Sequence, residues 1–143
     1  MKLVLDTNVV VSALLWRGKP FRLLDAVQKR PDLRLCSSPA LLAELADVLS
    51  RPGLTRRLDL IGGTAGGLVI AYAEAVEVFE PSDVPRIVPT DPDDDHVMAA
   101  AVAAGAALLI TGDADLTALS VHGGVRIASV ADAFHILGLG QDC

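Results

Sequence analysis

Residues 2–15 read KLVLDTNVVVSALL: a short apolar run, one acid, and then a longer, mostly apolar stretch. The run at residues 2–5 is rich in leucine and valine, which is typical of a strand buried on both faces of a parallel sheet. Asp6 ends this strand, and the residues after it predict a helix that stops near Gly18 and Pro20. The start of the chain therefore predicts a strand followed by a helix.

Strand and helix patterns alternate along the rest of the chain. Further strands are predicted at residues 33–38, 106–111 and 125–129, with a short edge segment at residues 77–81. Helices are predicted at residues 20–30, 39–51, 54–61, 68–76, 91–105 and 129–138. This alternation predicts a three-layer α/β/α fold, in which helices flank a central, mainly parallel sheet of four to five strands. With 143 residues and no interdomain linker, we expect a single domain over residues 1–143.

The composition is that of a folded protein without a membrane segment. Hydrophobic residues make up 52% of the chain and charged residues 21%, with a net charge of −6. This charge argues against a basic surface over the whole protein, although it is compatible with a local basic patch. Cys36 and Cys143 make no disulfide framework, and we find neither a signal peptide nor an apolar run of about 18 residues. We therefore expect a cytoplasmic protein with reduced thiols and no membrane partner.

Two of the predicted strands end in acids. Asp6 follows the strand at residues 2–5, and Asp113 follows the strand at residues 106–111. The carboxyl ends of parallel strands meet at one edge of the sheet, where the ligands of open α/β proteins bind. A single acid in such a place is more often a helix cap, but two acids in the same place count against capping as the whole explanation.

The stretch DPDDDH, residues 91–96, holds four more acids, which we divide by position. Asp91 precedes Pro92 and is expected to be the N-cap of a helix, so Asp93 and Asp94 fall in its first turn. The helix dipole favours carboxylates there by about 0.3–1 kcal/mol each. These three acids therefore need no functional explanation.

Asp95 differs because helical spacing puts it on one face with Met98, Ala99 and Val102, the face that we expect to turn to the core. A buried carboxylate is costly unless it is paired or bound to a cation. A buried salt bridge and a metal ion would both meet this need, and we favour the metal ion.

Glu44 is a fourth acid of interest, in the predicted helix at residues 39–51. Taken alone, it is typical of a solvated glutamate or one that pairs with a neighbouring helix. A functional role for Glu44 is better supported when it is considered together with the other acids. No lysine lies near these acids in the sequence to pair with them, since all lysines lie in the first 29 residues. The missing late lysine also argues against a phospho-receiver domain. A haloacid-dehalogenase-type phosphatase would need a second acid at Asn8, after Asp6.

Two other ligand motifs are excluded. GGTAGG at residues 62–67 is not followed by the Gly-Lys-Ser/Thr of a phosphate-binding loop, so we interpret it as a turn between helices. His96, His122 and His135 are isolated from one another and do not predict a zinc site.

The chain resembles a PIN domain over essentially its whole length. The resemblance rests on VLDTNVVVSALL at residues 4–15, Glu44, and DPDDDHVMAAAVAAGAALLITGDADL at residues 91–116. It is closest to the bacterial PIN proteins grouped as toxin components of toxin–antitoxin systems, the VapC-like ribonucleases. The triplet DTN alone is a weak motif, whereas the ordered set of acids is specific.

The resemblance implies a metal-dependent endoribonuclease that hydrolyses RNA phosphodiester bonds. The catalytic and metal-binding acids of the family map onto Asp6, Glu44, Asp95 and Asp113, with Asp115 as an additional metal ligand. Thr7, Asn8 and Thr111 are expected to hydrogen-bond around this site. The family also implies a Mg²⁺ or Mn²⁺ cofactor, a homodimer and a cognate antitoxin protein. Both cations prefer oxygen ligands, which these side chains provide.

An RNA substrate needs cations near the acidic site. Candidate phosphate contacts are Arg51, Arg56 and Arg57 in the segment RPGLTRR, and Arg17 and Lys19 after the first helix. A mean hydropathy of +0.47 also predicts an exposed apolar face for the homodimer, at residues 60–76 or 134–140. Two alternative functions remain: a catalytically inactive PIN-fold module that binds RNA or protein, and a housekeeping RNA-processing nuclease.

Overall fold

The computed structural model describes residues 1–81 and 92–139, and in the second range it describes side chains from residue 95 onward. The first range contains β1 (Lys2–Leu5), α1 (Thr7–Leu15), α2 (Lys19–Gln28), β2 (Arg34–Ser37), α3 (Pro39–Leu49), the 3-10 turn η1 (Pro52–Leu54), α4 (Thr55–Ile61), α5 (Ala65–Ala75) and β3 (Glu77–Val78). The second contains α6 (Pro92–Ala104), β4 (Leu108–Ile110), α7 (Ala114–Thr117), β5 (Val121–His122), β6 (Val125–Ala128) and α8 (Val130–Ile136).

In the part of the chain that the structure describes, the strands form one six-stranded sheet in the order β3-β2-β1-β4-β6-β5. All neighbours pair in parallel except β5, which is antiparallel to β6. The predicted mainly parallel sheet is therefore confirmed. Strand β5 is the one strand that was not predicted. Its two residues pair with β6 across a turn at Gly123 and Gly124, and two residues are too few to show an alternation of apolar and polar side chains.

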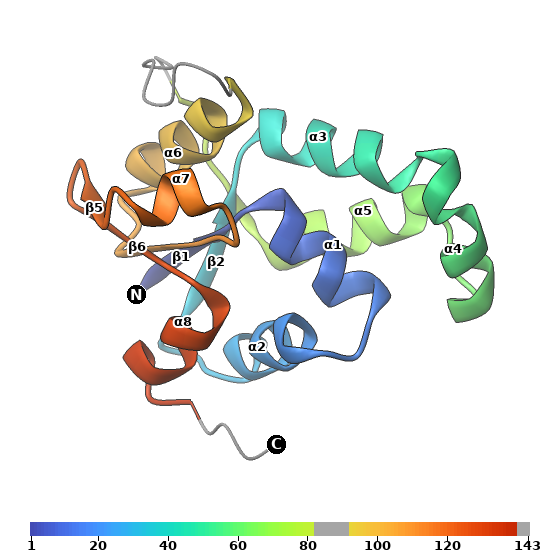
Figure 1. Ribbon diagram of the computed structural model, residues 1–143, viewed down its shortest axis with the longest axis horizontal. Coiled ribbons are helices and arrows are strands. Elements are labelled where there is room, and N and C mark those ends of the chain that lie inside the picture. Colours follow the sequence, from blue (N-terminus) through green and yellow to red (C-terminus); the bar gives the residue numbers. More distant parts are fainter. Residues whose placement is uncertain (82–91, 140–143) are drawn as a thin grey trace.

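The side chains of the central strands alternate between two cores, one on each face of the sheet. Leu3 and Leu5 belong to one apolar cluster, whereas Val4 between them belongs to the other. Helices α1, α2, α3, α5 and α8 contribute to the first cluster, and α6 supplies most of the helical side chains of the second. The helices therefore cover both faces of the sheet, as the three-layer prediction requires (Figure 1).

Local sequence signals explain where several helices begin and end. The Ser38 Oγ accepts a hydrogen bond from the Leu41 backbone N–H at 3.2 Å, and Pro39 follows as the first residue of α3. The glycine-rich segment is the predicted turn between helices: Gly62 ends α4 with a φ of +70°, which a side chain would disfavour, and Thr64 caps α5. No helix within the described residues has both the length and the apolar character to cross a lipid bilayer.

Cys36 on β2 is a buried, free thiol. Burial is the main cause that raises its pKa above the ordinary value, so the thiol is held in its neutral form. Cys143 lies outside the described residues.

Candidate functional site

Asp6 and Thr111 meet where the order of the strands reverses. They follow β1 and β4, which lie side by side at the centre of the sheet while the chain leaves them in opposite directions. The Asp6 backbone N–H donates to the Ile110 carbonyl at 2.9 Å, which brings the ends of the two strands level. The Thr111 hydroxyl then donates to Asp6 Oδ2 at 2.7 Å. This reversal point is the usual ligand site of an open α/β sheet.

Asp113 and Asp115 are connected to the same group by hydrogen bonds. The Asp113 backbone N–H donates to Thr111 Oγ1 at 3.0 Å, and the Asp115 backbone N–H donates to Asp113 Oδ1 at 2.8 Å. Thr111 is completely buried, Asp113 is half-buried and Asp115 is exposed in the first turn of α7. The structure thus brings together Asp6, Thr111, Asp113 and Asp115 at one edge of the sheet.

Asp95 lies in the first turns of α6 and is 1% exposed, so its predicted burial is confirmed. Met98 and Ala99 are buried with it, but Val102 is 46% exposed, and the prediction that it turns to the core is wrong. Ala101 and Ala104 of the same helix are buried, so Val102 lies beside the buried face and not on it, next to the β5–β6 turn and close to Gly123. Asp91 and the side chains of Asp93 and Asp94 lie outside what the structure describes.

Glu44 is half-buried on α3, the helix that packs against both α1 and α6. Leu41 on the preceding turn is buried, and Val48 on the next turn is half-buried. Glu44 therefore projects from the apolar side of the helix and not from a solvated face. Its helix begins at the carboxyl end of β2, on the same edge of the sheet as Asp6.

The side chains around this edge suit a hard divalent cation in their chemistry. The atoms that would bind a cation are carboxylate and hydroxyl oxygens. Two of the carboxylates are buried, with Asp6 8% exposed and Asp95 1% exposed. Within the described residues, however, there is no group of three or more His, Cys, Asp or Glu side chains that could hold a metal ion as they stand. The donor types therefore fit Mg²⁺ or Mn²⁺, although the predicted acids do not form a ready-made ligand set.

A sequence model of the PIN domain family matches residues 2–115, a range that includes every acid predicted for the site. The chain belongs to the PIN domain family. Among solved structures, it is similar in fold to a chain in the crystal structure of VapBC2 from Rickettsia felis bound to a DNA fragment from their promoter. That similarity has a TM-score of 0.62 at 16% sequence identity, and it covers 90% of this chain and 98% of that chain. No curated protein matches the chain.

Thr7 and Asn8, the other two polar residues predicted for the PIN-domain site, do not contact Asp6 through a side-chain hydroxyl as Thr111 does. Thr7 is buried, and its backbone N–H donates to Asp6 Oδ1 at 2.8 Å. Asn8 is exposed, and its side chain makes no hydrogen bond with a described residue. The Asp6 carboxylate is thus held from two sides, by the Thr7 amide and the Thr111 hydroxyl, while Asn8 faces solvent.

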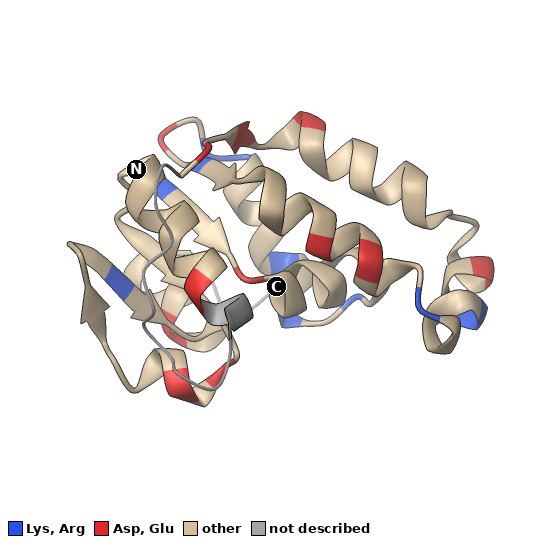
Figure 2. Cartoon of the chain, turned by 90° about the horizontal axis from the view of Figure 1, so that it is seen from above, with Lys and Arg blue, Asp and Glu red and all other residues tan. Residues whose placement is uncertain are grey.

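The cations predicted as phosphate contacts of this PIN domain lie away from the sheet edge, around α4 and the start of α2 (Figure 2). Arg51 forms an exposed ion pair with Asp47 at 3.4 Å, whereas Arg17, Lys19, Arg56 and Arg57 form none with a described residue. Two of them instead lie over aromatic rings: Arg17 over Phe21 and Arg57 over Trp16. Neither Trp16 nor Phe21 was predicted to be functional, although Trp16-Arg17 in a chain with 3% aromatic residues is a usable signal.

Proposed function

We propose that this PIN domain is a Mg²⁺- or Mn²⁺-dependent endoribonuclease that hydrolyses RNA phosphodiester bonds and is the toxin of a toxin–antitoxin pair. The observation that carries the proposal is the hydrogen-bonded group of Asp6, Thr111 and Asp113 at the reversal point of the strand order. Membership of the PIN domain family supports nuclease chemistry at this place. The buried Asp95 supports a cationic ligand, because carboxylates are rarely buried without one or without a paired group.

In this proposal each side chain has a separate task. The catalytic and metal-binding acids are Asp6, Glu44, Asp95 and Asp113, and Asp115 is a further metal ligand. Thr111 and the Thr7 amide orient the Asp6 carboxylate, and Asn8 offers a polar group to the solvent side of the site. When bound, the divalent cation supplies activation of water and neutralises the charge that develops on the phosphodiester.

The proposed phosphate contacts are Arg51, Arg56, Arg57, Arg17 and Lys19. All but Arg57 are exposed, and Arg57 is half-buried, so they are accessible to a nucleic acid. Because the chain carries a net charge of −6, these cations are needed to offset repulsion between the protein and an RNA backbone.

The remaining parts of the proposal concern partners. The fold shared with a chain of the VapBC2 complex supports a cognate antitoxin protein, and we propose a cytoplasmic location for the pair. A homodimer is supported by Leu60 and Ile70 on α4 and α5, which are 71% and 63% exposed. The second candidate for the dimer face, residues 134–140, is less suitable because Phe134 and Leu137 are buried in the core.

RNA cleavage by matched variants tests the catalytic assignment. We expect Asp6→Asn and Asp95→Asn to lower the cleavage rate by about 10²-fold or more, the range for loss of one electrostatic contributor. The control variants Asp93→Asn and Asp94→Asn should remain active, since those acids are assigned to the start of the helix. Inactivity of Asp94→Asn together with full activity of Asp95→Asn would overturn this division.

Thermal unfolding with Mn²⁺ gives a second readout that does not depend on turnover. Mn²⁺ should raise the Tm of the wild type by mass action, and this rise should disappear in Asp95→Asn. A rise of the Tm together with RNA binding but no cleavage would favour the inactive binding module. Active protein that does not arrest growth on expression would favour a housekeeping nuclease.

A further inference from the structure

A pocket with aromatic and cationic walls lies at the end of α1 that is far from Asp6. Its volume is about 230 Å³, and its lining includes Trp16, Arg17, Phe21, Arg57 and Ile61. The helix between Asp6 and the pocket has nine residues, so at about 1.5 Å per residue the pocket begins about 14 Å from the acidic edge. Helices α1 and α3 both begin at that edge and run outward toward α4 (Figure 1).

The two arginines of the pocket are held in place by rings and backbone. The guanidinium carbon of Arg17 lies 4.4 Å from the centroid of Phe21, and that of Arg57 lies 5.4 Å from the centroid of Trp16. Arg57 Nε also donates to the Leu15 carbonyl at 2.7 Å, one of the carbonyls that the end of α1 leaves without a helical partner. Arginines positioned in this way lose less conformational freedom when they bind an anion.

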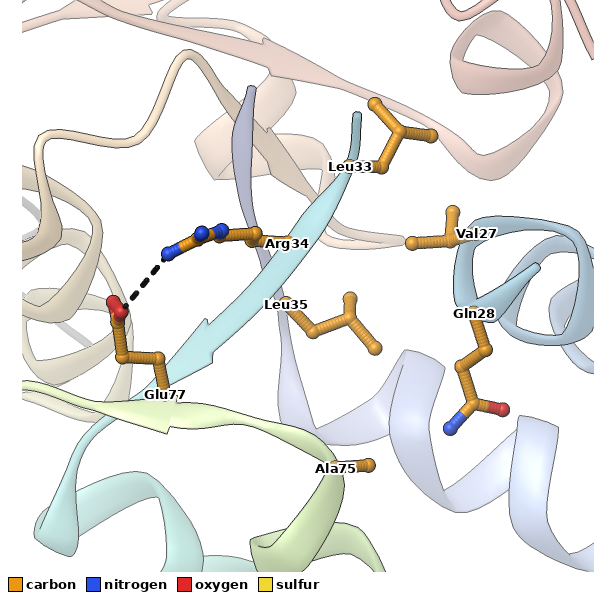
Figure 3. A pocket seen from close by; sticks show the side chains of 7 residues that line it. All are labelled: Val27, Gln28, Leu33, Arg34, Leu35, Ala75 and Glu77. Atoms are coloured by element: carbon orange, nitrogen blue, oxygen red, sulfur yellow. Dashed lines mark ion pairs between the residues drawn. The ribbon is translucent and has the colours of Figure 1, made fainter. Parts of the chain in front are cut away.

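No acid among the described residues neutralises these arginines. The neighbouring cations Lys19 and Arg56 also lack ion pairs there, and the exposed acid of α4, Asp59, pairs with none of them. Another cavity, of about 360 Å³, differs in this respect, because its Arg34 lies 3.7 Å from Glu77 (Figure 3). In an acidic protein, a group of ordered cations without counter-charge indicates a negatively charged ligand.

We propose, on the basis of the ribonuclease function above, that this pocket is a subsite for single-stranded RNA. A base stacks on Trp16, which is 43% exposed, and Arg17 and Arg57 contact the neighbouring phosphates. Aromatic platforms combined with arginine are a general means of binding single strands. A stacked strand rises about 3.4 Å per nucleotide, so the subsite holds RNA about four nucleotides from the scissile bond.

Fluorescence tests the proposal directly, because Trp16 is the only tryptophan in the chain. In buffer without divalent metal, a short single-stranded oligoribonucleotide should quench the fluorescence of the wild type in a saturable manner. Anisotropy of the same labelled RNA should show about tenfold weaker binding to Trp16→Ala, within the range for loss of one stacked base. Trp16→Phe, which keeps an aromatic ring, should retain most of the affinity.

Salt dependence tests the arginines. Arg17→Gln and Arg57→Gln should each reduce the slope of log K against log salt by about 0.7, the value for one phosphate contact with a single strand. Arg126→Gln is the matched control, because it removes an exposed arginine from β6, at the other end of the molecule from α4 (Figure 1). Its slope should equal that of the wild type.

These experiments distinguish failure of the RNA subsite from failure of the nuclease proposal. RNA binding without quenching, or with full affinity in Trp16→Ala, overturns the subsite and leaves the nuclease proposal intact. Absence of RNA binding in both readouts counts against both. Equal quenching by duplex RNA overturns base stacking, since paired bases are not available to the indole. The protein encoded by the reading frame next to this gene is the candidate for the proposed antitoxin. If that protein quenches the fluorescence and RNA does not, the pocket is a protein-docking site and the RNA subsite is wrong.

Discussion

Asp6 and Asp113 are helix caps as well as proposed metal ligands. The helix cap that the sequence left open as the simpler interpretation is confirmed for both: Asp6 caps α1, and Asp113 caps α7. A carboxylate has about four acceptor positions, so accepting a cap hydrogen bond at Oδ1 is compatible with the proposed role of Asp6 as a metal ligand. Capping therefore orients these carboxylates and does not exclude the proposed metal-binding role.

Tyr72 offers a prediction at the scale of one residue. It is 4% exposed on α5, and this burial raises the pKa of its hydroxyl. The hydroxyl has no hydrogen-bond partner among the described residues. Because a buried hydroxyl without a partner costs free energy, Tyr72→Phe should stabilise the protein by about 1 kcal/mol. Urea unfolding measures this difference. Tyr72→Ala is the contrasting variant and should destabilise by about 3–5 kcal/mol through a cavity; a less stable Tyr72→Phe would mean that the hydroxyl has a partner.

At the scale of elements, one arginine joins the segment between α2 and β2 to the end of α8. Arg30 donates to both carboxylate oxygens of Asp32, at 2.8 and 2.7 Å, and to the Leu137 carbonyl at 3.1 Å. The hydrogen bonds from Arg30 are the main cause that lowers the pKa of Asp32 from 3.8 to about 2. A carboxyl whose pKa is lower in the folded protein stabilises the fold above its unfolded pKa.

The stabilising effect of Asp32 should therefore be complete above about pH 4 and lost as the pH falls toward 2. We expect Asp32→Asn to be less stable than the wild type at pH 5 and equally stable near pH 2, by urea unfolding at each pH. The difference should be small because the pair is exposed. Asp59→Asn removes another exposed acid, one without a described ion pair, and serves as the control. A difference that persists unchanged at pH 2 would contradict the assignment.

At the scale of the whole molecule, the apolar surface on α4 and α5 predicts assembly. We expect a dimer at micromolar concentration by light scattering, and we expect it to survive high salt because apolar contacts are not screened. Ile70→Glu should shift the protein toward the monomer. Val121→Glu is the control, since Val121 is 61% exposed on β5, away from α5. A wild type that is strictly monomeric, or a dimer that salt alone dissociates, would refute the apolar interface.

Local patterns in the sequence determined the order of the elements and several of their ends. Ser38-Pro39 predicted the start of α3, the glycine-rich segment predicted a turn, and the two acids at strand ends were assigned to one edge of the sheet. Such features depend on neighbours in the chain, through capping, backbone freedom and the period of apolar residues. The sequence also predicted that Asp95 is buried, although its metal-binding role and that of Glu44 remain predictions.

Only the tertiary structure decided which distant groups meet. The Thr111 hydroxyl reaches Asp6 because β1 and β4 are neighbours, a pairing that no local spacing contains. Val102 has the helical spacing of a core residue but is exposed, because burial depends on what packs against the helix and not on its period alone. The stacking of Arg57 on Trp16 likewise depends on how α4 packs beside the end of α1. These contacts arise from long-range packing, which the order of residues specifies only through the whole fold.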